Sequence, residues 1–288
     1  MIIHDFIQLI LFVALLIGFT PLLGNYMYKV YTGSKHFMLP VFSWLEKLTC
    51  KFSGVNPDEE TNWKSYTFGL LMFNLAGFVL LFLIQLFQSY LPLNPSHLAD
   101  VSWHSAFNTA VSFMTHTNWQ GYAGETTMSY FVQMVGLTVQ NFVSAATGIA
   151  VIIAVTRGIS RKNTEKIGNF WTDLTRSTIY VLIPLSIMFA IVLVGQGVVQ
   201  NFKHYETIQT ISGVQQVLPM GPAASQIAIK QLGTNGGGFF NANSSHPFEN
   251  PTPFSNFLQM LAIFLIPAGL TYMSVSYTHL TLPTTERV

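Results

Sequence analysis

Five long apolar runs constrain the fold of this chain more than any other feature of its sequence. None of them contains Asp, Glu, Lys or Arg, and they cover residues 6–23, 67–91, 128–155, 177–200 and 254–273. A helix of about 20 apolar residues crosses the roughly 30 Å hydrocarbon core of a bilayer. The sequence therefore predicts an all-α integral membrane protein with five spans. No basic segment precedes the first run, so we expect that span to be retained rather than cleaved.

Charge and cysteine content argue against several other classes of protein. Charged residues make up 9% of the 288 residues, against about 25% in ordinary soluble domains. The net charge of +1 gives no basic excess for nucleic-acid binding. Cys50 is the single cysteine, and the histidines show no metal-ligand spacing. We therefore expect no disulfide, no nucleic-acid partner and no structural metal site.

The distribution of Lys and Arg predicts the orientation of the chain. These residues gather in segments 24–64 and 156–176, whereas segment 89–128 has none. Short loops that are rich in Lys and Arg stay in the cytoplasm. We therefore expect both basic segments to be cytoplasmic and the N-terminus to lie outside.

Amide side chains within the second and third runs should face the interior of a helix bundle, because unpartnered amides in lipid are costly. These residues are Asn74, Gln85, Gln133, Gln140 and Asn141. Interhelical hydrogen bonding is the first interpretation of these amides, and direct contact with an ion is the alternative.

Two segments between the runs are predicted to be re-entrant. Residues 103–115 and 222–232 read as short helices, too short to cross a bilayer, and each breaks into a stretch of Gly, Asn and Thr. Irregular backbone is tolerated at membrane depth only where protein buries it or a water-filled cavity receives it. We therefore infer a pore or a binding site at these two irregular stretches.

The two breaks share a sequence pattern. Thr117-Asn118, with Gly121 and Tyr122 after it, matches Thr234-Asn235, with Gly238 and Phe239 after it, at an offset of 117 residues. The flanks agree, because each unit reads long helix, outer segment, short helix, break and long helix. Repeats of this kind are common in transport proteins.

Such breaks can coordinate a cation with backbone carbonyls. The glycines at position 121 and positions 236–238 allow positive φ angles, the hydroxyls of Thr117 and Thr234 add oxygen ligands, and no carboxylate lies within either break. This favours a monovalent ion over a divalent one. A tight turn between packed helices is the alternative; a phosphate loop is disfavoured because no Lys-Ser or Lys-Thr follows the glycines.

The runs SFMTHTNWQGYAGETT and GTNGGGFFNANSSHPFENP closely resemble the potassium-binding A subunit of the Kdp-type potassium-transporting ATPase (KdpA), in its N-terminal half, and the likeness covers residues 5–272. The resemblance implies a potassium-channel-like fold of the superfamily of K+ transporters. Residues 1–66 would form a leading transmembrane helix and a cytoplasmic loop. Residues 67–156 and 157–275 would form two units of helix, pore loop and helix.

What the resemblance implies for function is potassium uptake driven by a separate enzyme. The chain would bind external K+ at a selectivity filter and translocate it in the bacterial inner membrane, without an organic cofactor. A P-type ATPase subunit (B) would hydrolyse ATP, with small C and F subunits beside it. This sequence lacks the Asp-Lys-Thr-Gly phosphorylation motif, so it would be a non-catalytic subunit.

Residue by residue, the resemblance implies a filter made of two loops. The first comprises Thr117, Asn118, Trp119, Gln120 and Gly121, and the second comprises Gly233, Thr234, Asn235, Gly236, Gly237 and Gly238. His116 stands where the family usually has Asn. We hypothesise that its protonation repels cations and lowers the apparent affinity for potassium at acid pH.

Two departures from the family leave other interpretations open. Only two of the family's four pore units are present, and residues 276–288 read as a polar tail that is atypical for it. Either two such chains pair, or this is a truncated and inactive half-subunit. A potassium channel or symporter that works without an ATPase is another alternative. An integral-membrane enzyme is disfavoured because no acidic or Cys/His cluster is present.

Overall fold

The computed structural model describes residues 3–161 and 164–281. Within these ranges, five helices are long and apolar enough to cross a membrane: Asp5–Tyr31, Trp63–Leu86, Val132–Ser160, Phe170–Gly195 and Pro253–Ser276. The all-α membrane class and the five spans are confirmed. Of the atypical tail, residues 276–281 extend the last helix and residues 282–288 lie outside the described residues.

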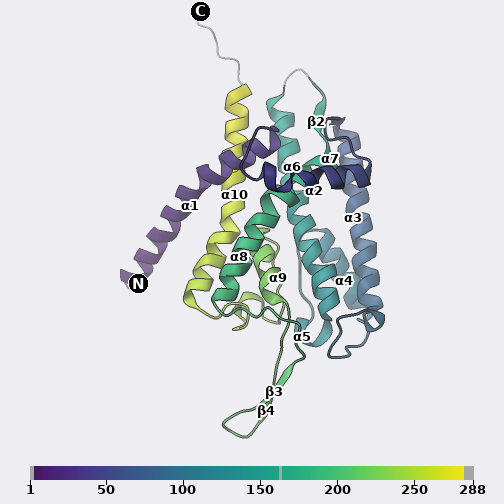
Figure 1. Cartoon of the computed structure of the whole chain (residues 1–288), viewed down its shortest axis with the longest axis vertical. Coiled ribbons are helices and arrows are strands. Elements are labelled where there is room, and N and C mark those ends of the chain that lie inside the picture. The colour runs from purple at the N-terminus through teal and green to yellow at the C-terminus, as the bar shows by residue number, and fades with distance from the viewer. Residues whose placement is uncertain (1–2, 162–163, 282–288) are drawn as a thin grey trace, which may run out of the picture. The chain divides into compact units, whose positions relative to one another are not determined.

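The elements follow one another along the chain as helices with short strands between them (Figure 1). The α-helices are α1 (Ile3–Tyr31), α2 (Leu39–Ser53), α3 (Trp63–Leu86), α4 (Trp103–Met114), α5 (Gly124–Thr127), α6 (Val139–Ser160), α7 (Phe170–Arg176), α8 (Ile183–Gly195), α9 (Ala223–Leu232) and α10 (Pro253–Thr281). Short 3-10 turns are η1 (Gln88–Tyr90) and η4 (Asn243–Ser245), and π-helical segments are η2 (Val132–Thr138) and η3 (Ser177–Leu182). The strands are β1 (Thr61–Asn62), β2 (Lys166–Gly168), β3 (Glu206–Gln209) and β4 (Gln215–Leu218).

The strands form two antiparallel pairs. β1 pairs with β2, and β3 pairs with β4 in a hairpin that aligns Glu206 with Leu218 and Gln209 with Gln215. The two predicted short helices are present as α4 and α9, between the long helices that flank them in sequence. The polar segments between spans thus carry both the short helices and the hairpin.

The chain forms two compact units. One contains Met1–Met72, Ala145–Pro184 and Met260–Val288, and the other contains Phe73–Ser144 and Leu185–Gln259. The division into residues 1–66, 67–156, 157–275 and 276–288 stays a prediction, because a repeat unit is defined by correspondence of sequence and a compact unit by contacts.

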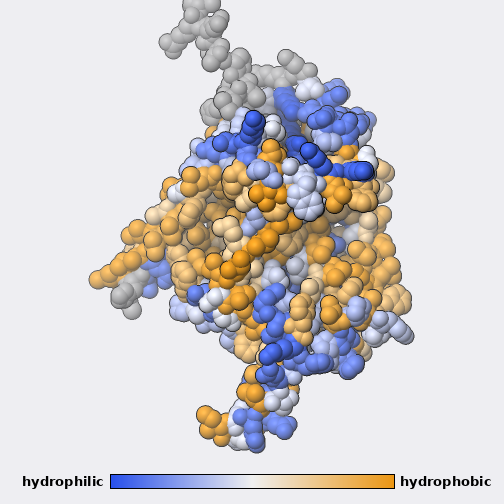
Figure 2. Space-filling model, in the orientation of Figure 1, coloured by the Kyte–Doolittle hydropathy of each residue, from blue (hydrophilic) through white to orange (hydrophobic). Residues whose placement is uncertain are grey.

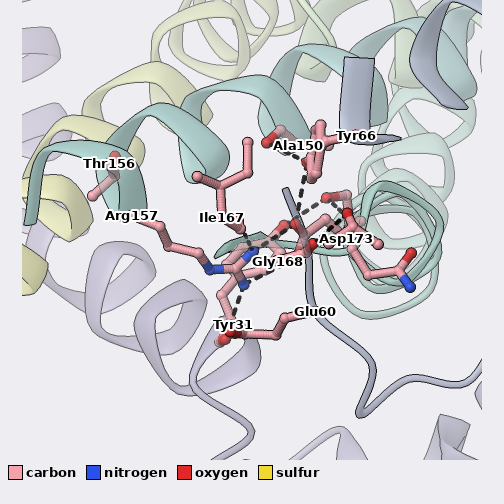
Figure 3. A network of polar contacts seen from close by, with 12 residues as sticks. Tyr31, Glu60, Tyr66, Ala150, Thr156, Arg157, Ile167, Gly168 and Asp173 are labelled. Carbon is pink, nitrogen blue, oxygen red and sulfur yellow. Dashed lines mark hydrogen bonds and ion pairs between the residues drawn. The ribbon is translucent and has the colours of Figure 1, made fainter. Parts of the chain in front are cut away.

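The first unit is centred on a buried ion pair. The guanidinium of Arg157 at the end of α6 donates from Nη1 to Asp173 Oδ2 over 2.6 Å and from Nη2 to Asp173 Oδ1 over 3.0 Å. Tyr66 of α3 donates its hydroxyl to Asp173 and to the carbonyl of Ala150, and Arg157 also reaches the carbonyl of Tyr31 (Figure 3). A buried charge is costly unless it is paired, so these contacts cannot be broken without a large loss of stability. The network therefore holds α1, α3, α6 and α7 together.

The two basic segments contact each other within this unit. Arg161 pairs with Glu60 over 2.9 Å, Arg176 pairs with Glu46 over 2.8 Å, and β1 pairs with β2. The two segments therefore lie side by side in this unit, and their cytoplasmic orientation stays a prediction.

Large apolar side chains face outward along the long helices, and Figure 2 shows hydrophobic residues over much of the visible surface. Ile10 and Ile17 of α1, Phe68 and Leu75 of α3, and Phe264 of α10 are each about half exposed or more. An outward apolar face on a helix of this length suits lipid rather than water.

The second unit has two hydrophobic clusters, one around each short helix. The cluster at α4 includes Ala106, Ala110 and Phe113, and the cluster at α9 includes Ile227 and Ala228. The predicted interior position of the amides is confirmed for Gln85, Gln133, Gln140 and Asn141, which are buried, whereas Asn74 is only partly buried. The short helices are thus packed among buried apolar side chains of this unit.

Candidate functional site

The first loop begins where α4 ends at Met114. The carbonyl of Ser112 accepts hydrogen bonds from the amides of Thr117 and Asn118, over 2.9 and 3.1 Å. His116 and Asn118 adopt left-handed backbone, with φ of 59° and 54°. The hydroxyl of Ser112 accepts from the amide of Trp119. The chain therefore turns sharply off the helix end and is held against its last turn.

The second loop leaves α9 in the same way. The carbonyl of Lys230 accepts from the amide of Asn235 over 3.0 Å. Thr234, Gly236 and Gly237 have φ of 55°, 83° and 70°. Gly236 and Gly237 thus use the conformational freedom that glycine alone supplies cheaply.

The backbone register of the repeat differs by one residue from the sequence pattern. The backbone amides of Thr115 and Gly233 donate to the carbonyls of Val111 and Ile229, which lie four residues earlier in each case. The amides of the next two residues in the two loops also donate to carbonyls at the same spacing along the chain. The equivalent positions are therefore 118 residues apart rather than 117, so the predicted offset is wrong for the backbone. Thr-Asn lies one residue further from the helix end in the first loop, and the helix end, rather than the side chains, determines the backbone path.

Two predicted left-handed glycines are not left-handed. Gly121 and Gly238 are absent from the positive-φ residues, whereas His116, Asn118 and Thr234 adopt that conformation without being glycine. Gly238 is required for space instead, since a Cβ there would lie 2.7 Å from a carboxylate oxygen of Glu249. Gly121 has room for a side chain, its nearest neighbour being Asn108 Nδ2 at 3.7 Å.

The two loops meet through their backbones. A Cβ on Gly236 would lie 3.8 Å from the carbonyl oxygen of Thr117, and one on Gly237 would lie 3.2 Å from that of Asn118. A side chain at position 237 would also approach Gln120 Oε1, at 4.0 Å. Thr117 and Asn118 thus present carbonyl oxygens to the glycines of the second loop.

Side-chain amides from both loops are anchored on α6. Asn118 Nδ2 donates to Asn141 Oδ1 over 2.8 Å, and Asn235 Nδ2 donates to Ser144 Oγ over 3.4 Å. Among the described residues, the Oδ1 atoms of Asn118 and Asn235 and the Oε1 atom of Gln120 are buried without a hydrogen-bond donor, and Gln120 Nε2 is buried without an acceptor. Buried oxygens without donors are what a cation would use.

The remaining predicted residues lie at the edges of this arrangement. Trp119 is 67% exposed, and Thr117 and Thr234 are exposed as well. Gly233 is the C-cap of α9 in ordinary right-handed backbone. The side chains of these residues therefore lie at the edges of the loops, although the backbone carbonyl of Thr117 faces Gly236.

His116 lies beside Ser144 of α6, the residue that also binds the side chain of Asn235. Its Nδ1 is 2.7 Å from Ser144 Oγ, the hydroxyl that Asn235 also reaches. Partial burial lowers the pKa of the His116 imidazole from its ordinary value of 6.5. The ring is therefore neutral near pH 7.

Two residues behind the loops were missed from the sequence. The sequence predicts that Asn141 faces the bundle interior, with direct ion contact as the alternative, but it singles out neither Ser144 nor a role for Lys230. The signal for Lys230 was present, because a lysine within the short helix AASQIAIKQL requires a partner at membrane depth.

The family model for the potassium-transporting ATPase A subunit matches residues 10–279. This chain belongs to that family. The potassium-binding subunits of the potassium-transporting ATPases of Pseudomonas syringae pv. tomato and Sorangium cellulosum are each 55% identical to it. The alignment covers 93% of this chain and 48% of the former protein, and 92% and 47% for the latter.

A further relative gives the same coverage. The potassium-binding subunit from Herpetosiphon aurantiacus is 55% identical over 94% of this chain and 48% of its own length. The chain thus spans about half the length of the curated relatives it matches. The resemblance to the A-subunit family is confirmed, and the chain is a multi-pass membrane protein.

Proposed function

We propose that the two loops bind a dehydrated potassium ion and pass it on as part of an ATP-driven uptake complex. The observation that carries this proposal is the meeting of Gly236 and Gly237 with the carbonyl oxygens of Thr117 and Asn118. The filter residues are those predicted from the sequence: Thr117, Asn118, Trp119, Gln120, Gly121, Gly233, Thr234, Asn235, Gly236, Gly237 and Gly238.

Helix ends and carbonyl dipoles support a monovalent cation. α4 and α9 both end at the loops, and a helix C-terminus carries a partial negative charge that favours cations. Backbone carbonyls replace a hydration shell without the strong binding that carboxylates give to divalent ions. Two loops supply part of a coordination shell, and further loops, from the same subunit or a second copy, complete it.

The names of the relatives, potassium-binding subunits of potassium-transporting ATPases, support potassium as the substrate and an ATPase as the source of energy. We infer a P-type ATPase subunit (B) and small C and F subunits as partners, and the bacterial inner membrane as the location. The segments 24–64 and 156–176 would then face the cytoplasm, and the N-terminus would lie outside.

Substitution of Gly236 tests the filter. Gly236→Ala forces a side chain into left-handed backbone beside Thr117, and we expect the apparent KM for K+ uptake to rise about tenfold or more, since strain of this kind costs on the order of 1–3 kcal/mol. The chain is expressed from its own locus in cells without other potassium uptake systems, and K+ uptake is measured.

Gly213→Ala is the matched control for this substitution. Gly213 also has positive φ, at 79°, but it lies in the β3–β4 turn with nothing within 4 Å of an added Cβ. Equal effects of the two substitutions would refute the filter. Uptake that persists after ATP depletion, with ion gradients held, would instead favour a channel or symporter.

A further inference from the structure

A buried ion pair lies directly behind the second loop. Lys230 Nζ, in the last turn of α9, is 2.9 Å from Glu249 Oε2, and the two side chains are 1% and 0% exposed. Charges this deeply buried lose their hydration, and replacing such a pair with apolar residues is often neutral or favourable for stability. Stability alone therefore gives little reason to place two charges here.

The pair joins the two ends of the loop. Lys230 precedes the loop, and its carbonyl accepts from the amide of Asn235. The other carboxylate oxygen of Glu249 accepts from the amide of Phe240, over 2.7 Å, just after the loop. One carboxylate thus links the last turn of α9, before the loop, to the residue that follows the loop, and it lies against Gly238 where a Cβ would clash.

Other polar side chains hold the Lys230–Glu249 ion pair, called the clamp from here on, in place. Lys230 Nζ also donates to Ser244 Oγ over 3.0 Å, and Gln231 Nε2 donates to the same hydroxyl over 2.8 Å. Gln231 donates to Gln259 Oε1 over 2.7 Å, and Gln259 donates to the Glu249 carbonyl over 2.9 Å. These hydrogen bonds close on the pair, so neither charge can rotate away without breaking other bonds.

The first loop is closed from the equivalent helix position without a charge. Ser112 corresponds to Lys230 in the backbone register, and its hydroxyl accepts directly from the amide of Trp119. The second loop, which carries three consecutive glycines, has less side-chain packing of its own to hold its shape. The ion pair supplies that restraint.

We propose that Lys230 and Glu249 are positioning residues that hold the second loop in the geometry that selects potassium. The inference rests on the proposed function, because it concerns the same loop. The pair does not touch the ion in this account; it acts through the backbone of Gly238 and Phe240.

The test replaces both charges so that neither is left unpaired. The double variant Lys230→Met with Glu249→Leu is expressed from the chain's own locus, and its amount in the membrane, its maximal uptake rate, and its apparent KM for K+ and for Rb+ are measured. We expect normal assembly, an apparent KM for K+ raised about tenfold, and a changed ratio of the two KM values, because a hydrogen bond to a charged group is lost.

Glu249→Asp keeps the test decisive if the double variant does not assemble. It retains the charge and shortens the side chain by one methylene, so it should shift the same KM ratio by a smaller factor. Lys203→Gln is the control, because it breaks an exposed pair with Glu206 in the same unit, at 3.8 Å and 71% and 51% exposure. We expect it to behave as the unaltered chain.

The outcomes separate this inference from the proposed function. If Gly236→Ala raises the KM but the assembled clamp variants keep the normal KM and ratio, the clamp inference is wrong and the filter stands. If Gly236→Ala has no effect, the filter itself is wrong. A loss of maximal rate at unchanged KM and ratio would make the pair merely structural and would also overturn the inference.

Discussion

His116 is the residue at which the two loops differ most in chemistry. In the backbone register it corresponds to Thr234, and both residues have left-handed backbone. The resemblance places the histidine beside the filter. A hydrogen bond joins its ring to the hydroxyl of Ser144, which also accepts from Asn235. A titratable ring therefore lies next to the proposed cation site.

Acidification is expected to weaken potassium uptake through this ring. Burial lowers the pKa of His116 below 6.5, so the imidazole is neutral near pH 7 and becomes positively charged as the pH falls through that lowered value. The apparent affinity for K+ should be constant near neutrality and fall on the acid side. Uptake kinetics at a series of pH values, for the unaltered chain and for His116→Asn, measure this.

The asparagine variant should lose the acid-side decrease. His97→Asn is the control, since His97 also has positive φ but lies in a turn before α4. A His116→Asn profile that matches that of the unaltered chain would assign the pH dependence to another group.

The residues of both loops could be predicted from the sequence, but their register could not. The Thr-Asn-x-x-Gly pattern falls in the two loops that follow α4 and α9, and their role as a filter stays a prediction. Hydrogen bonds from the last turns of α4 and α9 set the equivalence one residue away, and those bonds depend on where each helix ends. The unpaired oxygens of Asn118 and Asn235 likewise depend on what α6 contributes, which no local pattern encodes.

At the scale of elements, long apolar helices were predictable and locally irregular ones were not. A run of apolar residues is a strong signal, so all five spans were found. The π-helical segments η2 and η3 result from packing, and the β3–β4 hairpin has four-residue strands too short for a clear alternation. Charge pairing across distant segments, such as Arg157 with Asp173, was equally beyond a local pattern.

Removal of that ion pair should destabilise the first unit strongly. Asp173→Ala leaves the buried Arg157 guanidinium without its carboxylate, and we expect a loss of about 3–5 kcal/mol in the free energy of unfolding. Thermal unfolding of the purified complex in detergent measures the effect. Tyr66→Phe, which removes one hydroxyl from the same network, should cost only about 1 kcal/mol.

The comparison between these two variants is informative in either direction. Equal stability of Asp173→Ala and the unaltered chain would mean that the network in Figure 3 does not hold α3, α6 and α7 together. A larger loss for Tyr66→Phe than for Asp173→Ala would assign the main contribution to the hydroxyl.

At the scale of the whole molecule, family membership follows from a match over residues 10–279. The chain nevertheless spans about half the length of its relatives, and it supplies two loops of the proposed filter. Composition and hydropathy predicted a membrane protein, and the motifs predicted the family. Neither could predict how the loops approach each other, because that arrangement comes from packing around α4, α6 and α9.

The position of the bound ion tests the central claim most directly. Anomalous diffraction from crystals of the assembled complex grown with Rb+ in place of K+ locates the ion without relying on transport. We predict a peak between the carbonyl oxygens of Thr117 and Asn118 and the backbone of Gly236 and Gly237. Rubidium bound elsewhere in the chain, with none at these loops, would contradict the account.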